Sequence, residues 1–254
     1  MENNINYCAD ATQNVYVLKE LFLTDPIKFA FEIYDSEIDY KFTEFKIVNE
    51  GYLMIYRKFN PVTIILHAEK ESTVTELLSL ISEDKFVLFI EPKWRYLLNF
   101  SNMKIYPELI MICKTPNIFR REGVRKLTVE DSDQIVELYE KDRGSFVTQM
   151  LREGKTTAYG LFSGHKLVSV AYTWIETKDA GVIGGVLTKE EFRNKGFATS
   201  VVSSLTEDIT RRGKVASLYV REDNVTAIHV YKNIGFTEYW KRLWVSVNTD
   251  AKPL

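Results

Sequence analysis

The sequence predicts an α/β protein of two domains, and three observations favour that class. Short apolar runs typical of strands alternate with segments whose apolar residues recur at helical spacing. Glycine and proline usage changes along the chain: of 12 glycines only Gly51 precedes residue 123, and of 6 prolines only Pro253 follows it. The length of 254 residues favours more than one domain. We therefore expect a smaller α/β domain over residues 1–120 and a second domain over 121–254.

The composition is that of a soluble globular protein, with 45% hydrophobic and 27% charged residues. A net charge of -2 gives no reason to expect nucleic acid or an anionic membrane as a partner. The start "MENNINYCADATQ" lacks the basic and apolar stretches of a secretory signal. Cys8 and Cys113 are too few for a disulfide framework, and no metal-ligand spacing occurs. We expect a cytoplasmic protein without a bound metal.

The N-terminal domain shows a mixture of helical and strand patterns but no cluster of residues that suggests chemistry. Ser72 or Thr73 is the expected cap of its third helix, which has apolar residues at helical spacing. Helices are predicted within 12–25, 25–38 and 72–84, and strands near 43–49, 52–58, 62–68, 85–91 and 108–114.

The second domain begins with a strand and a helix for which Asp131 or Ser132 is the expected cap. Two strands joined by a turn at 163–166 follow, and then the glycine-containing strand "AGVIGGVLT" at 180–188. A helix after Gly196, a strand near 215–223, a helix from Asn224 to Gly235 and a final strand region at 236–247 complete the domain. This order implies a mixed, mostly antiparallel sheet covered by helices.

The stretch "RNKGFAT" at 193–199 connects the glycine-containing strand to an amphipathic helix. The first backbone N–H groups of a helix have no internal partners and attract anions. Gly196 removes a side chain that would keep a phosphate from this backbone, and Arg193 and Lys195 add positive charge. The stretch therefore predicts a diphosphate site, although a lone glycine at a helix start is more often only a turn.

Two further features strengthen that interpretation. Gly184 and Gly185 lie inside the preceding strand, where glycine often marks a bulge or the close approach of a ligand. The later segment "EDNVTAIHVYKNIGF" carries Asn224 at a helix start and Tyr231 two turns later.

With these motifs the C-terminal half resembles the GNAT superfamily of acyl-CoA N-acyltransferases over about residues 124–245. The family's acyl-CoA signature, [RQ]-x-x-G-x-[GA], is matched at residues 193–198, and its pattern N-x-x-A-x-x-x-Y-x-x-x-G-F at 224–236. The resemblance implies acyl transfer from acetyl-CoA to a primary amine by direct attack in a ternary complex.

The resemblance also implies roles for individual residues. The pantetheine arm of the cofactor would pair with a splayed strand, and its diphosphate with backbone amides; Tyr231 resembles the general acid that protonates the departing thiolate. A backbone N–H of Val186 or Leu187 is the expected oxyanion donor. The cofactor-binding residues implied in this way are Val186, Leu187, Thr188, Arg193, Asn194, Lys195, Gly196, Phe197, Ala198, Thr199 and Asn224.

The general base is the least defined part of the site. Glu176, at the end of the strand before the glycine-containing one, is one candidate, and Glu222 and Asp223 are others. Acidic residues at strand ends are usually solvated, so the sequence leaves the choice open.

Three classes of function remain to be distinguished: an acetyl-CoA-dependent N-acetyltransferase, a non-catalytic acyl-CoA sensor, and a structural protein in which Gly196 only makes a turn. The acceptor is expected to be a small-molecule or peptide amine, and a homodimer is compatible with the sequence. The N-terminal domain lacks the acyl-CoA signature, and we expect it to be a degenerate copy that shapes the acceptor pocket.

Overall fold

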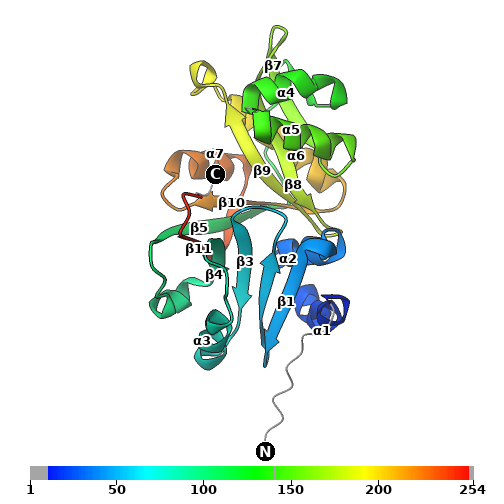
Figure 1. The fold of residues 1–254 in the computed structure, drawn as a ribbon. Helices are drawn as coiled ribbons and strands as arrows, with labels where there is room; N and C mark the ends of the chain where they lie inside the picture. Colours follow the sequence, from blue (N-terminus) through cyan, green and yellow to red (C-terminus); the bar gives the residue numbers. More distant parts are fainter. Residues whose placement is uncertain (1–10, 140, 252–254) are drawn as a thin grey trace, which may run out of the picture. The chain divides into compact units, whose positions relative to one another are not determined.

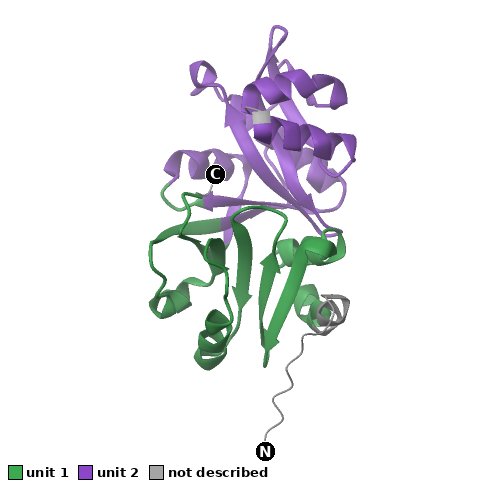
Figure 2. Cartoon of the chain, in the orientation of Figure 1, with its two compact units in different colours: residues 1–109, 221–223, 240–254 green, residues 110–220, 224–239 purple. Residues whose placement is uncertain are grey.

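The computed structural model describes residues 11–139 and 141–251, which form two compact units (Figure 2). Unit 1 comprises the described residues up to Leu109 together with Arg221–Asp223 and the described residues from Trp240. Unit 2 comprises Ile110–Val220 and Asn224–Tyr239. This division departs from the expected boundary at residue 120, because the chain returns to unit 1 near its C-terminus. No sequence pattern marks that return.

Unit 1 contains a sheet together with three α-helices (Figure 1). The residues of β5 and β11 divide between the two units. The elements with residues in unit 1 are α1 (Ala11–Thr24), α2 (Ala30–Glu37), β1 (Thr43–Val48), β2 (Gly51–Tyr56), β3 (Val62–His67), α3 (Glu71–Ser79), β4 (Phe86–Ile90), β5 (Met103–Cys113) and β11 (Thr237–Val247).

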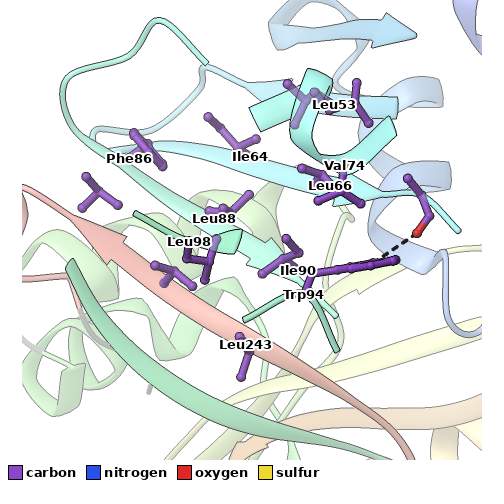
Figure 3. Packing of buried hydrophobic residues seen from close by; sticks show 14 of the residues in the cluster. Leu53, Ile64, Leu66, Val74, Phe86, Leu88, Ile90, Trp94, Leu98 and Leu243 are labelled. Atoms are coloured by element: carbon purple, nitrogen blue, oxygen red, sulfur yellow. Dashed lines mark hydrogen bonds between the residues drawn. The ribbon is translucent and has the colours of Figure 1, made fainter. Parts of the chain in front are cut away.

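The sheet of unit 1 has the strand order β1-β2-β3-β4-β11. The pairs β1–β2, β2–β3 and β4–β11 are antiparallel, whereas β3 and β4 are parallel and are connected through α3. The apolar side chains of the strands and of α3 pack together, and the Trp94 indole N–H donates a hydrogen bond to the Ala68 carbonyl at 3.2 Å (Figure 3).

Unit 2 follows with a second set of strands and helices (Figure 1). Its remaining elements are β6 (Val124–Lys126), α4 (Ser132–Tyr139), α5 (Lys141–Arg152), β7 (Ala158–Ser163), β8 (Lys166–Glu176), β9 (Ala180–Thr188), α6 (Phe197–Arg211), β10 (Val215–Arg221, of which Arg221 belongs to unit 1) and α7 (Val225–Ile234).

The strand order in unit 2 is β6-β7-β8-β9-β10, with three antiparallel pairs and one parallel pair, β9–β10. Helix α6 connects the parallel pair and packs on β7, β8 and β9. Helices α4 and α5 cover the apolar face that carries Val170 and Tyr172. The predicted mixed, mostly antiparallel α/β fold is thus confirmed.

The two units repeat one order of elements. Each has two helices, then three strands joined in antiparallel pairs, then a helix and a strand parallel to the third strand. In unit 1 this series runs from α1 to β4, and in unit 2 from α4 to β10. None of the described helices is both long and apolar enough to cross a membrane.

Helix α3 begins differently from the expectation, and the 3-10 turn before α4 has a cap of its own. Helix α3 begins one residue before Ser72, and its N-cap is Lys70, which makes no side-chain capping bond. The turn before α4 is capped by Thr128, whose backbone N–H donates to Asp131 at 2.9 Å. The sequence alone does not single out the N-cap of a helix where several neighbouring residues are of types that cap well.

A β-bulge in β9 lies next to its two glycines. Leu187 pairs with Val170 and Gly184 with Tyr172, so that two residues of β9 stand opposite Ala171 alone. Gly185 adopts φ +57, and a Cβ built on it would lie 2.0 Å from Cε1 of Tyr172. The bulge therefore requires glycine at this position for two independent reasons.

Gly185→Ala is expected to lower the free energy of unfolding by about 2–4 kcal/mol, because it adds steric overlap to the cost of a left-handed residue. Gly164→Ala is the matched control, since Gly164 has φ +61 and its Cβ would meet nothing within 4 Å. The control is expected to cost about 1 kcal/mol. Urea unfolding of both variants measures the difference, and equal costs would contradict the role of the Tyr172 ring.

Candidate functional site

The backbone amides at the start of α6 are free of protein acceptors. Among the described residues, no backbone or side-chain acceptor is found for the N–H groups of Asn194 to Thr199. The first amide of this helix that is hydrogen-bonded is that of Ser200, which donates to the Gly196 carbonyl at 3.2 Å. Residues 193–196 are exposed and 197–199 half-buried, so an anion can reach these donors.

The turn before α6 contains two residues in the left-handed region, Asn194 with φ 60 and Gly196 with φ 75. A Cβ built on Gly196 would lie 3.2 Å from Nη2 of Arg121. The guanidinium of Arg121 also lies 5.7 Å from the centre of the Phe197 ring. A positive charge therefore stands beside the free amides.

Sequence analysis missed Arg121, which it assigned to the boundary between domains. The segment that carries Arg121 is held along α6 by Ser203, whose Oγ accepts from the Phe119 N–H at 2.9 Å and donates to the Asn117 carbonyl at 3.0 Å. No motif links this segment to Gly196, because only the tertiary structure brings them together.

The basic side chains that sequence analysis assigned to the site bond to neighbouring carbonyls. Nε of Arg193 donates to the Thr188 carbonyl at 3.3 Å, and Nζ of Lys195 donates to the Glu191 carbonyl at 3.0 Å. Lys195 also lies 5.0 Å from the Phe192 ring centre. Both side chains are exposed, so they contribute positive charge at the edge of the turn.

Strands β9 and β10 separate beside the bulge. Their parallel register runs from Ala180 and Val215 to Ile183 and Leu218 and then ends. Beyond that point Val186, Leu187 and Thr188 have no partner in β10, although β8 still pairs with Leu187 and Thr188 on the other edge. The Thr188 hydroxyl is buried and lies 2.8 Å from Oγ of Ser169, so that Thr188 offers only its backbone.

The space beside the two glycines of β9 is filled by aromatic rings. Besides the contact of Gly185 with Tyr172, a Cβ built on Gly184 would lie 3.2 Å from the Cβ of Trp174. The Tyr139 hydroxyl donates a hydrogen bond to the Gly185 carbonyl. These glycines therefore make room for side chains of β8. From the sequence, the close approach of a ligand was an equally good reason for them.

Helix α7 carries the two remaining motif residues. Asn224 caps the helix, since its Oδ1 accepts from the Ala227 N–H at 3.2 Å, and Gly235 ends it with φ 110. Tyr231 is 8% exposed, and its hydroxyl has no hydrogen-bond partner among the described residues. Burial raises the pKa of Tyr231 to about 12. The phenol is therefore protonated at neutral pH and can donate a proton.

Glu176 lies away from the free amides. It forms ion pairs with Arg212 and with Lys214, the latter at 2.6 Å, and both cations follow the C-terminal end of α6. Burial alone would raise the pKa of the Glu176 carboxyl, but hydrogen bonds from Arg212 and Lys214 outweigh it and hold the pKa below its ordinary value. The structure does not bring Glu176 to the amide site, because the length of α6 separates the two.

The other two acidic candidates also hold cations. Glu222 pairs with Lys241 at 2.9 Å, and Asp223 is bound by the guanidinium of Arg221. All four residues belong to unit 1. Both carboxylates are thus engaged by cations of unit 1.

The chain is similar in sequence to known proteins. Residues 158–245 match the family model described as FR47-like protein. An uncharacterized N-acetyltransferase of Methanocaldococcus jannaschii is 26% identical over 143 residues, an alignment that covers 48% of this chain and 63% of that protein. The chain thus spans less than two thirds of this curated relative.

Solved structures share the fold at low sequence identity. A Drosophila protein has a TM-score of 0.70 and 11% identity, with 94% of this chain and 97% of that chain covered. A GCN5-related N-acetyltransferase from Kribbella flavida has a TM-score of 0.62 and 14% identity, with 83% and 91% covered. A putative GNAT acetyltransferase from Novosphingobium aromaticivorans has a TM-score of 0.57 and 18% identity, with 83% and 93% covered.

Gly196→Val is expected to abolish binding of pyrophosphate and of coenzyme A, because the side chain would stand among the free amides. Gly213→Val is the matched control: Gly213 follows the other end of α6 with the same φ of +75, and its Cβ would meet nothing within 4 Å. Both variants carry the same backbone strain. Calorimetric titration should show binding only for the control and the parent protein, and retained binding by Gly196→Val would contradict the site.

Glu176→Gln is expected to lower the free energy of unfolding by about 1–2 kcal/mol at neutral pH, through weakened charged hydrogen bonds. Because the folded-state pKa of Glu176 is lowered, its stabilisation is present above the unfolded-state pKa of about 4.3 and is lost as pH falls through the folded value. Urea unfolding from pH 7 to pH 3 measures this. A difference between variant and parent that grew on acidification would contradict the assignment.

Proposed function

We propose that the C-terminal half of this chain is a GNAT-type domain and that the protein is an acetyl-CoA-dependent N-acetyltransferase. The acyl group passes from the thioester sulfur of coenzyme A to a primary amine by direct attack in a ternary complex. The observation that carries the proposal is the set of acceptor-free amides from Asn194 to Thr199, which begins a few residues after the separated edge of β9.

The amides at the start of α6 fit the diphosphate of coenzyme A. They supply several donors together with the partial positive charge of a 15-residue helix. Arg121 stands beside Gly196 without an ion-pair partner among the described residues, so its charge is available to a phosphate. By contrast, Arg120 is bound to Glu207 at 2.6 Å.

The free edge of β9 fits the pantetheine arm. Val186 and Leu187 lie where β10 no longer pairs with β9, and an amide-bearing chain placed there takes the position of a neighbouring strand. A backbone N–H of Val186 or Leu187 then stands ready to donate to the oxygen that becomes negative when the amine attacks the thioester carbonyl.

Tyr231 serves as the general acid in this proposal. When the carbon–sulfur bond breaks, the phenol gives its proton to the departing thiolate, and solvent later restores it. The raised pKa keeps the phenol protonated beforehand, and its hydroxyl has no competing protein partner among the described residues. The amine loses its proton to a water molecule, since Glu176 is committed to cations at the other end of α6.

A non-catalytic acyl-CoA sensor is the second candidate. The observation that favours it is that Glu176, Glu222 and Asp223 are all engaged in ion pairs. A sensor would bind coenzyme A through the same amides without transferring the acyl group. Release of free thiol from acetyl-CoA in the presence of a panel of primary amines distinguishes the two functions.

We further propose that unit 1 is a degenerate copy that does not bind coenzyme A. Its helix α3 begins with Glu71 directly after Lys70, with no glycine and with a carboxylate where a phosphate would have to approach. At the end of the neighbouring strands, Oε1 of Glu91 lies 3.7 Å from Nδ1 of His67 and binds Lys28 at 3.2 Å. Ion pairs thus fill the place that corresponds to the separated strands of unit 2.

Tyr231→Phe is expected to lower kcat by about 100-fold or more while the affinity for coenzyme A stays unchanged, because only proton donation is lost. Tyr159→Phe is the control, since it removes a phenol of the same unit that lies 3.4 Å from Asp208. Thiol release and calorimetric titration measure the two quantities. Parental turnover in Tyr231→Phe would remove the assigned role.

The pH profile of kcat offers a second check on Tyr231. With a pKa of about 12, the phenol stays protonated across the usual assay range, so its ionisation causes no loss of activity near pH 10, the ordinary value for tyrosine. An alkaline decline with an apparent pKa near 10 in the parent protein, absent from Tyr231→Phe, would contradict this assignment.

A further inference from the structure

The guanidinium of Arg143, which has no carboxylate partner among the described residues, lies near the bulge in β9. Arg143, in the first turn of α5, has its Cζ 5.1 Å from the centre of the Tyr139 ring, and the Tyr139 hydroxyl binds the Gly185 carbonyl. Nη2 of Arg143 is buried and has no hydrogen-bond partner among the described residues. Arg143 also forms no ion pair with any carboxylate in the part of the chain that the structure describes.

The Tyr172 hydroxyl shares this environment. Tyr172 is fully buried, and its hydroxyl too is without a hydrogen-bond partner among the described residues. Its ring meets that of Tyr139 edge-on, with centroids 5.9 Å apart. Burial raises the pKa of Tyr172, and the nearby Arg143 partly offsets that effect. The Arg143 guanidinium and the Tyr172 hydroxyl therefore stand together, and neither Nη2 of Arg143 nor the Tyr172 hydroxyl has an acceptor among the described residues.

Packing holds these donors in place. A Cβ built on Gly144 would lie 2.4 Å from Cα of Val136, so α5 approaches α4 at backbone contact distance. The Tyr172 ring is fixed on the other side by Gly185 and by Trp174, whose ring centroid is 6.2 Å away. Arg143 as a whole is partly buried, whereas its Nη2 atom is buried.

Unsatisfied buried donors of this kind are costly and call for a partner. The partner that suits a guanidinium fork and a phenol is a carboxylate, which can accept two parallel N–H bonds and one O–H bond. The diphosphate of coenzyme A is a poor candidate for this partner, because the protein amides that we propose bind it lie after Thr188, at the start of α6. The bulge, in contrast, is where the proposed function places the reacting carbonyl.

We propose that Arg143 and the Tyr172 hydroxyl bind the carboxylate of an amino-acid acceptor, whose amine then faces the thioester at the bulge. This inference rests on the proposed acetyl transfer and names the class of acceptor. Arg143 and the Tyr172 hydroxyl would suit a carboxylate on the acyl group equally well. The experiment therefore also tests an acyl-CoA that carries a carboxylate.

The test measures thiol release from acetyl-CoA with glycine and alanine against glycinamide and alaninamide. Each amide has the same side chain as its partner but lacks the carboxylate. The parent protein is expected to favour the free amino acids by about 10- to 100-fold in kcat/KM, the effect of one charge-assisted, bidentate contact. Equal use of acids and amides would overturn the inference while leaving acetyl transfer intact.

Arg143→Gln is expected to remove that preference through a higher KM for the amino acids, with a smaller change in kcat and none in the affinity for coenzyme A. Arg143→Lys should restore part of it, because lysine keeps the charge but not the fork. Arg152→Gln, an exposed arginine in the last turn of the same helix, is the matched control. If Arg143→Gln kept the parental preference, the inference would be wrong.

The acyl arm replaces acetyl-CoA by succinyl-CoA with glycinamide as acceptor. A preference for succinyl-CoA that Arg143→Gln abolishes would contradict the acceptor assignment, whereas no such preference supports it. Thermal unfolding checks that each variant is folded, and the comparison of acids with amides needs only the parent protein. If the protein did not transfer acetyl groups at all, the result would be different: no amine would cause release of thiol.

Discussion

Residue 185 can carry no side chain, because the Tyr172 ring occupies the place of its Cβ and the backbone there is left-handed. The bulge that results is held from the helical side by the Tyr139 hydroxyl, which binds the Gly185 carbonyl. Directly before the bulge the parallel register with β10 ends at Ile183. This steric constraint thus coincides with the free edge of β9, where we propose that an extended ligand binds, and with the nearby Arg143 guanidinium.

The two ends of α6 differ in chemistry in the way the helix dipole favours. At its start, amides without acceptors and Arg121 present positive charge to solvent. At its end, Arg212 and Lys214 both form ion pairs with Glu176. The anion site that we propose therefore lies at one end of the helix, and Glu176 has a structural task at the other.

The two units share one order of elements but carry different residues at corresponding places. In unit 2 a glycine turn precedes the helix between the parallel strands, and the strands separate; in unit 1 the corresponding helix begins with Glu71, and Glu91 with its ion pairs stands at the end of the strands. A shared topology does not require shared chemistry, because ligand binding depends on a few side chains at the helix start and the strand ends.

Much of this protein is determined by local sequence: the alternation of strands and helices, the glycine turn at 196, the cap at Asn224 and the end of α7 at Gly235 all depend on neighbours within one turn or strand. Two things depended on the tertiary structure. The first is that residues 240–251 join unit 1. The second is which distant side chains meet: Arg121, Arg143 and Tyr172 have the roles that we propose because of contacts with residues far away in the chain. Glu176, in contrast, is held by Arg212 and Lys214 and not at the site where the sequence had placed it. Short-range spacing carries no information about such contacts, because it is the packing of helices on the sheet that decides which distant side chains meet.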